Sequence, residues 1–159
     1  MFVVSDKKQE KFLRKKTAEF DFSKFTKKEI QELVIRMKRI MRAANGVGLS
    51  ANQIGLGMKM FVAEVPDAEG GLKFYAIFNP VVEKLSEEKN VLEEGCLSIP
   101  GTFGDVPRAA RIAIKAQDKN GHTIKIKAWG FLARVFQHEI DHLNGHVFTD
   151  RTKHVHSDE

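Results

Sequence analysis

Two histidines and a glutamate lie close together in the segment FQHEIDHLNG at 136–145. His138 and His142 are four residues apart, which is slightly more than one helical turn. If the segment is helical, both imidazoles project from one face and can bind one metal ion, with Glu139 beside it as a general base. The alternative is a pair of core histidines that hydrogen-bond to backbone groups. The HExxH pattern alone does not decide between the two.

A catalytic metal site of this kind needs a third protein ligand and one open position for water. The metzincin pattern would have a third histidine at position 148, where this sequence has Phe148, and few residues follow to supply the glutamate ligand of thermolysin-like enzymes. His146, His154 and His156 are alternatives, but the last two lie in a polar segment. The pattern therefore disfavours an ordinary metalloprotease.

Cys96, the single cysteine of the chain, is the other candidate for the third ligand. It lies in EEGCLSIPG (93–101), where Gly95 and Pro100 predict a sharp turn beside the end of a strand. A thiolate with two imidazoles is a recognised catalytic ligand set, and a bound cation would keep the thiol deprotonated. The alternative is an inert thiol that packs as a small buried hydrophobe.

The histidines need a helix to bring them onto one face, and the sequence predicts one from Gly130 to Leu143, with Gly145 placed to cap its end. Another amphipathic helix is predicted over 27–44. TKKE at 26–29 is a capping box, apolar residues follow at helical spacing, and Gly46 is expected to end the helix.

Segments rich in β-forming residues lie between the two helices, at 58–65, 72–79, 81–85, 110–117 and 122–129. The last two alternate apolar and polar residues around DKNG, and Asn-Gly favours the tight turn of a hairpin. We therefore predict an α+β fold in which antiparallel sheets pack around a central motif-bearing helix, preceded by an amphipathic helix.

The composition is that of a soluble globular protein, with 42% hydrophobic and 30% charged residues in 159. We predict one catalytic domain over 1–159, with a polar tail at 150–159 that is expected to be mobile. Because no apolar run could span a membrane and the N-terminal segment is unlike a signal peptide, a cytoplasmic protein without a membrane partner is predicted. The net charge of +5 is spread along the chain, so sequence-specific nucleic-acid binding is not expected.

Three motifs carry a family resemblance: GVGLSANQ (46–53), EGCLS (94–98) and QHEIDHLNG (137–145). In order and spacing they resemble the signature motifs of the peptide deformylases, and three ordered motifs are far more specific than HExxH alone. The resemblance implies a hydrolase that removes the formyl group from the N-terminal formylmethionine of nascent polypeptides and releases formate. It also implies one ferrous ion per chain, for which Zn²⁺, Ni²⁺ or Co²⁺ can substitute.

The resemblance also implies roles for individual residues. The residues that match the metal ligands are Cys96, His138 and His142. Glu139 matches the general acid and base, Gln53 the side-chain donor of the oxyanion hole, and Leu97 its backbone donor. Metal ions, positioned acids and oxyanion donors are the groups that hydrolysis of a stable formamide requires.

Gly46 and Gly48 match the loop along which the substrate backbone lies. Without side chains there, a peptide can approach and pair as an added strand, whereas the alternative is a plain helix terminator followed by a turn. The methionine side chain needs an apolar pocket. Our candidates for its lining, each otherwise an ordinary core residue, are Val47, Leu92, Phe131 and Val135.

The sequence departs from the common family pattern in several places. GLSANQ replaces the usual GLAAPQ, so Ser50 and Asn52 add polarity while the glutamine is kept. Arg134 stands where relatives often have an aliphatic residue; we interpret it as solvent-facing, the alternative being a place at the rim of the methionine pocket. Many bacterial relatives continue beyond Asp150 and Arg151 into a basic helix that docks on the ribosome, so only a weak ribosome association is expected here.

Two other classes of function compete with this prediction. A metallopeptidase would share the metal, the water and the glutamate, but it would cleave internal peptide bonds rather than release formate. A non-catalytic metal-binding or RNA-associated protein would account for the basic charge, yet it has no need of Glu139 and Gln53, which are both present.

Overall fold

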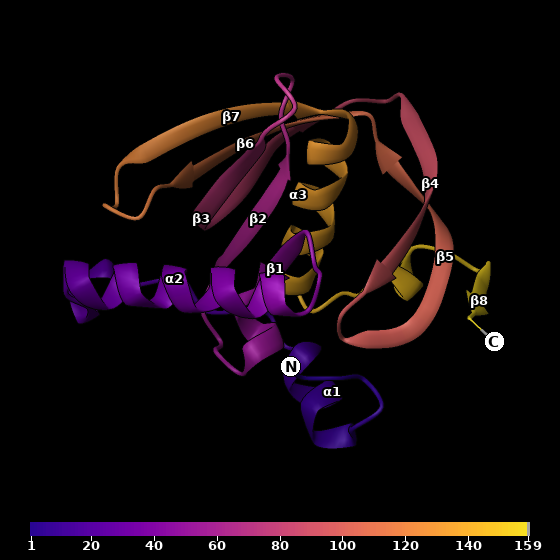
Figure 1. Ribbon diagram of the computed structural model, residues 1–159, viewed down its shortest axis with the longest axis horizontal. Helices are drawn as coiled ribbons and strands as arrows, with labels where there is room; N and C mark the ends of the chain where they lie inside the picture. The colour runs from indigo at the N-terminus through magenta and orange to yellow at the C-terminus, as the bar shows by residue number, and fades with distance from the viewer. Residues whose placement is uncertain (159) are drawn as a thin grey trace.

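The computed structural model describes residues 1–158 and has two antiparallel sheets on either side of one helix, α3 (Gly130–Leu143) (Figure 1). The larger sheet has the order β1 (Gly48–Ser50), β2 (Met60–Pro66), β3 (Leu72–Leu85), β6 (Arg111–Gln117) and β7 (Thr123–Trp129). The smaller sheet has the order β4 (Lys89–Cys96), β5 (Ile99–Ala109) and β8 (Val155–Ser157). This arrangement confirms the predicted α+β fold around the motif-bearing helix.

Helix α3 has the predicted bounds because both ends have strong local signals. It begins at Gly130, whose φ of 60° turns the chain out of β7, and Gly145 follows its end with a φ of 81°. A side chain at Gly145 would also collide with the carbonyl oxygen of Arg14, so glycine is required there for space as well as for φ. The buried side chains of α3 that pack on the larger sheet are Ala133, Val135, Phe136, Ile140 and Leu143.

The amphipathic helix α2 (Lys27–Ala43) covers the opposite face of the larger sheet. Alternate residues of β2 separate the two faces: Phe61 packs in the α3 cluster and Val62 in the α2 cluster. The predicted capping box is present, but the left-handed residue after the helix is Asn45, with a φ of 55°, rather than Gly46. Among residues 1–158, no helix has the length and apolar character needed to cross a bilayer.

Strand β3 corrects the prediction of separate strands at 72–79 and 81–85. The strand continues through Pro80, and its register against β6 shifts between Phe78 and Val81. Asn79 takes the left-handed conformation there, with a φ of 50°, and its side chain bonds the backbone of Phe20. A proline in mid-strand is tolerated at such a bulge because its missing N–H falls where the ladder is interrupted.

Several short or polar elements were not predicted from the sequence. They include strands β4, β5 and β8, helix α1 (Lys7–Leu13), and the 3-10 turns η1 (Phe22–Lys24), η2 (Ala51–Ile54) and η3 (Phe148–Asp150). The β4–β5 hairpin matters most for the site, because it contains Cys96. Its strands are rich in charged residues, Gly and Pro, which hide the usual alternation.

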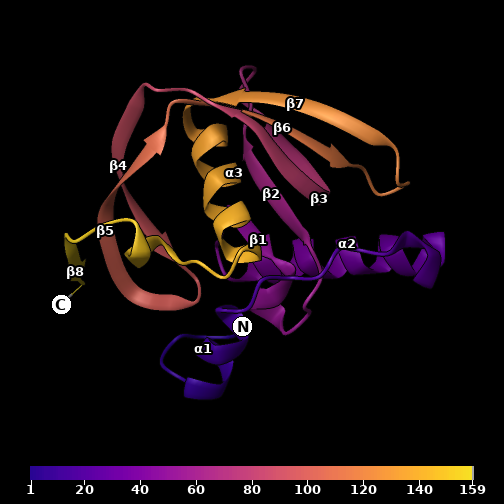
Figure 2. The ribbon, with the colours of Figure 1, turned by 180° about the vertical axis from the view of Figure 1, so that it is seen from behind.

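The C-terminal segment forms the outer strand of the small sheet (Figure 2). Val155–Ser157 pair with residues 102–104 of β5, and His156 Nε2 lies 3.2 Å from the Glu93 carboxylate. Residues 155–157 of the expected polar tail over 150–159 thus form a strand, while the mobility of that tail stays a prediction. Glu159, the end of that predicted tail, lies outside the described residues.

Candidate metal centre

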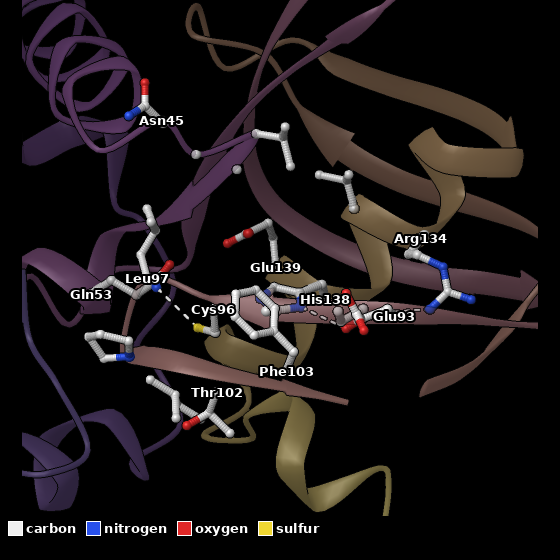
Figure 3. Close-up of a pocket in the computed structure, with 18 of the residues that line it drawn as sticks. Asn45, Gln53, Glu93, Cys96, Leu97, Thr102, Phe103, Arg134, His138 and Glu139 are labelled. Atoms are coloured by element: carbon white, nitrogen blue, oxygen red, sulfur yellow. Dashed lines mark hydrogen bonds and ion pairs between the residues drawn. The ribbon is translucent and has the colours of Figure 1, made fainter. Parts of the chain in front are cut away.

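Three candidate ligand atoms from two elements converge where α3 faces the small sheet; Figure 3 shows two of these residues, Cys96 and His138. Cys96 is the last residue of β4, and its Sγ lies 3.2 Å from Nε2 of His142. That nitrogen lies 3.3 Å from Nε2 of His138, and all three atoms fall within 4.8 Å of one another. Metal–ligand bonds of about 2.0 to 2.3 Å place tetrahedral ligands on the order of 3.5 Å apart, so this donor set fits one cation.

The two imidazoles have opposite electrostatic environments. Burial lowers the pKa of His142 well below its ordinary value, which keeps this ring neutral, as a ligand must be. Burial also acts to lower the pKa of His138, but the Cys96 sulfur and the Glu94 carboxylate outweigh it and raise the value to about 10. A cation bound at this site would therefore compete with a proton for His138.

Glu94 orients His138 and is itself held by buried arginines. Its Oε2 lies 2.9 Å from His138 Nδ1, and Arg108 donates to both carboxylate oxygens at 2.9 Å. Burial acts to raise the pKa of Glu94, but the bonds from His138 and Arg108 lower it to about 2. Arg108 also bonds Asp141 on α3. A carboxylate behind a ligating imidazole fixes its tautomer and orientation, which is the usual arrangement around such metals.

Arg134 is buried, in contrast to the solvent-facing arginine that we expected. Only 5% of it is exposed, and its Nη1 donates to Glu94 Oε1 at 2.7 Å. Its position on α3 does not by itself show whether the side chain is buried. The strands that cover it, β4 and β5, are distant in sequence. Arg134 also contributes to the wall of a cavity beside these groups, while its place at the rim of a methionine pocket stays a prediction.

Glu139 is buried beside the ligands, and its Oε2 has no hydrogen-bond partner among the described residues. Burial raises its pKa to about 7, with His138 acting in the opposite direction. Its Oε1 fits only because residue 48 is glycine: a Cβ at Gly48 would lie 2.5 Å from that oxygen. Gly46 similarly leaves space for Leu97, whose Cδ1 would lie 2.7 Å from an added Cβ. A side chain at either glycine would therefore displace Glu139 or Leu97 from its present position.

Gln53 is fixed at both ends of its amide. Its Oε1 accepts from the Ser50 amide at 3.0 Å, and its Nε2 donates to Ser98 Oγ at 3.0 Å and lies 3.7 Å from Cys96 Sγ. Asn52, in turn, donates from Nδ2 to the carbonyl of His142 at 2.7 Å. The polar residues of GLSANQ therefore tie η2 to the motif helix and hold Gln53 beside Cys96.

A cavity of about 530 Å³ opens beside these groups. The predicted site residues that line it are Gly46, Val47, Gly48, Gln53, Cys96, Leu97, Phe131, Val135, His138 and Glu139. Leu92 does not line it: it lies farther along the edge strand β4, with 53% of its surface exposed. In Figure 3 the Glu139 carboxylate points towards the side of the cavity where Gln53 and Leu97 lie.

Sequence reasoning missed the residues that support the ligands. Glu94 and Asp141 stand inside the recognised motifs, and charged residues at such positions were an available signal. Arg108 had no local signal, because its partners come from a different strand and from the helix. Phe103, which also lines the cavity, packs over Gly95, where an added Cβ would lie 2.8 Å from the ring.

Comparisons with known proteins give one consistent result for the family and the fold. The family model for polypeptide deformylase matches residues 3–158. The chain is 40% identical over 133 residues to the peptide deformylase of Halothermothrix orenii, covering 84% of this chain and 83% of that one. A probable peptide deformylase from Synechococcus phage S-SSM7 superposes with a TM-score of 0.85 and 38% identity, covering 96% of this chain and 98% of that one. The Acinetobacter baumannii peptide deformylase bound to Met-Ala-Ser gives a TM-score of 0.82 and 29% identity, covering 89% and 92%.

Proposed function

Since this chain belongs to the polypeptide deformylase family, we propose that Cys96, His138 and His142 bind the catalytic metal of its reaction. The enzyme is a metal-dependent hydrolase that removes the N-formyl group from the formylmethionine of nascent polypeptides. The observation that carries the assignment of the ligands is the convergence of one sulfur and two imidazole nitrogens beside a buried glutamate. When bound there, a cation polarises the formyl carbonyl and makes a water molecule acidic enough to act near neutral pH.

We propose Glu139 as the general acid and base. Its carboxylate accepts the proton of the attacking water and later donates it to the departing amine. A pKa raised to about 7 by burial suits both halves of this role, because the group can hold and release a proton near neutrality. The unpartnered Oε2 supports the assignment, since no other protein group competes for it among the described residues.

Gln53 and the Leu97 backbone amide are the proposed donors to the oxygen that becomes negative in the transition state. Gln53 is held by Ser50 and Ser98 and needs little reorganisation to present its Nε2. A single donor of this kind is typically worth about 3 kcal/mol of transition-state stabilisation.

The proposed substrate is a short segment of formylated peptide laid along β1. This strand is the edge of the larger sheet and includes Gly48, so its backbone can pair with an added strand. The proposed pocket for the methionine side chain is formed by Val47, Phe131 and Val135, which all line the cavity. The Acinetobacter baumannii structure contains Met-Ala-Ser, and we propose that peptides of this class bind here.

Ferrous iron is the proposed native metal, with Zn²⁺, Ni²⁺ or Co²⁺ as substitutes. Imidazole and thiolate ligands accept all four ions, and affinity alone disfavours Fe²⁺, so the supply of metal in the cell decides. Oxygen is the liability of iron, because it attacks both the metal and the Cys96 thiolate. Anaerobically purified enzyme should contain iron and lose activity in air, whereas a nickel-loaded form should stay active.

The decisive test pairs metal analysis with an assay on formyl-Met-Ala-Ser. Formate release without cleavage of the chain supports a deformylase, and cleavage of a blocked internal peptide bond would support a metallopeptidase instead. A zinc form purified in air that is fully active and stable would overturn the iron assignment and leave the hydrolase intact.

We also propose that the enzyme acts in the cytoplasm, where its nascent substrates are made, with only a weak attachment to the ribosome. Residues 155–157 are engaged in the small sheet, which supports the view that this segment is not a free docking helix. Cosedimentation with ribosomes tests this, and stable comigration in physiological salt would contradict it.

A further inference from the structure

The proposed metal ligands come from two layers of the fold. Cys96 ends β4 in the small sheet, whereas His138 and His142 belong to α3, which packs on the larger sheet. The 3.2 Å distance from Cys96 Sγ to His142 Nε2 therefore depends on how the small sheet is placed against α3. Ligand distances must be correct to within about 0.2 Å for a good metal site, so this placement has to be well defined.

Arg134 connects α3 to both long strands of the small sheet. Its Nη1 donates to the Val106 carbonyl of β5 at 2.9 Å and to Glu94 of β4 at 2.7 Å. Its Nη2 donates to the Asn90 carbonyl of β4 at 2.8 Å. One planar guanidinium thus bonds three fixed groups on two strands, a geometry that the single ammonium group of lysine cannot reproduce.

The same guanidinium also acts on the site through Glu94. Arg134 and Arg108 both donate to Oε1 of this carboxylate, while Oε2 lies against His138 Nδ1. Figure 3 shows Arg134 reaching from α3 towards this part of the small sheet. Removal of Arg134 would leave the buried Glu94 carboxylate with fewer donors and would take one donor each from the Val106 and Asn90 carbonyls, which favours a shift of the hairpin.

We propose that Arg134 is a positioning residue for the metal centre: it sets the small sheet against α3 so that Cys96 meets the two imidazoles, and it holds Glu94 against His138. This inference rests on the proposed metal site. The Arg134 guanidinium is carried on an unbranched stem of three methylene groups. Methionine matches that stem in length and has no N–H groups.

The test compares Co²⁺-loaded full-length enzyme with its Arg134→Met and Arg134→Lys variants. Each protein is challenged with increasing concentrations of a chelator, while the thiolate-to-cobalt charge-transfer band and the d–d bands are recorded. A matched control is Arg42→Met, because Arg42 also makes a two-point ion pair, but with Glu64 on β2 rather than with Glu94 behind His138. Circular dichroism and thermal melting show which variants are folded.

We expect Arg134→Met to lose Co²⁺ about 10- to 100-fold more readily than wild type, the usual effect of removing support behind a ligand, with altered d–d bands. The Co²⁺ affinity of Arg134→Lys should lie between those of wild type and Arg134→Met. Arg42→Met should match wild type in affinity and bands. A folded Arg134→Met with wild-type affinity and bands would overturn the inference. If that variant does not fold, a folded Arg134→Lys with wild-type affinity and bands would overturn it equally.

The two proposals fail in distinguishable ways. The ligand assignment would be overturned if the wild-type enzyme had no thiolate charge-transfer band, or if the band remained in the Cys96→Ala variant. Either result would overturn the role of Arg134 as well. A wild-type band that disappears in Cys96→Ala, together with an unaffected Arg134→Met, would overturn the role of Arg134 alone.

Discussion

Two glycines, Gly46 and Gly48, leave the space that the side chains of Leu97 and Glu139 occupy in the site. Gly48 faces the Glu139 carboxylate and Gly46 faces the Leu97 side chain, each closer than a real Cβ could come. Neither glycine has the positive φ that would demand glycine for conformational reasons. The absent side chains therefore leave space for Glu139 and Leu97 in their present positions.

The role of Glu139 predicts the behaviour of Glu139→Gln. The amide cannot accept the proton of the attacking water, so formate release should fall by about 10²- to 10⁴-fold, the usual worth of a general base. The bound metal should stay, because Cys96, His138 and His142 are unchanged. Formate assays and metal analysis on the same sample check this. Loss of metal together with activity would show that Glu139 is a ligand or a structural residue instead.

The close contact at Gly48 predicts that Gly48→Ala displaces the Glu139 carboxylate and lowers turnover with little change in folding. Gly57→Ala is the matched control, because a Cβ there meets only a Phe12 carbon at 3.8 Å. Steady-state kinetics and thermal melting of both variants measure the effect. Wild-type turnover in Gly48→Ala would mean that Glu139 tolerates displacement.

At the scale of elements, helix α2 is joined to the larger sheet by an ion pair as well as by its apolar face. Arg42 donates from Nε and Nη2 to the two carboxylate oxygens of Glu64 on β2, each at 2.9 Å. The hydrogen bonds from Arg42 lower the pKa of Glu64 below its ordinary value of 4.5. The folded state therefore favours the ionised form of Glu64.

This ion pair predicts a pH-dependent stability difference between the wild type and Glu64→Gln. Because the folded pKa is below the unfolded one, the contribution of Glu64 is fully present above pH 4.5 and is lost as the pH falls through the folded value. Denaturant unfolding should show the wild type more stable near pH 7, with the difference shrinking below pH 4.5. Glu69→Gln, in the exposed turn before β3, serves as control. A difference that grows in acid would contradict the assignment.

At the scale of the whole molecule, the proposed metal centre lies between the small sheet and α3, which packs on the larger sheet. Its ligands come from β4 and from α3, and buried ion pairs of Arg108 and Arg134 cross the same boundary. A cation that binds only the folded chain stabilises the entire fold, by about 2.7 kcal/mol when its free concentration is 100 times the Kd.

Removal of the metal should therefore lower the melting temperature. For a chain of this size each kcal/mol corresponds to roughly 2 to 4 °C, so chelation should lower Tm by about 5 to 10 °C under those conditions. Differential scanning calorimetry with and without chelator measures the shift. In Cys96→Ala the chelator should have much less effect. Equal melting of loaded and stripped wild-type enzyme would contradict a metal that bridges the two layers.

Local sequence was sufficient for the elements with the strongest local signals. Helix α3 and its two histidines follow from periodicity and flanking glycines, helix α2 from its capping box, and the hairpin of β6 and β7 from Asn-Gly. The three motifs likewise identified the family, because each contains its chemistry within a few residues.

Only the tertiary structure decided which faces of the helices and strands are buried and which segments cover them. Arg134 bonds groups 28, 40 and 44 residues away, so no local pattern could show that it is buried. The outward position of Leu92 and the pairing of 155–157 with β5 depend in the same way on strands distant in the chain. Periodicity shows that a residue lies on a given face, but packing against distant segments determines whether that face contacts solvent, a partner strand or a metal ligand.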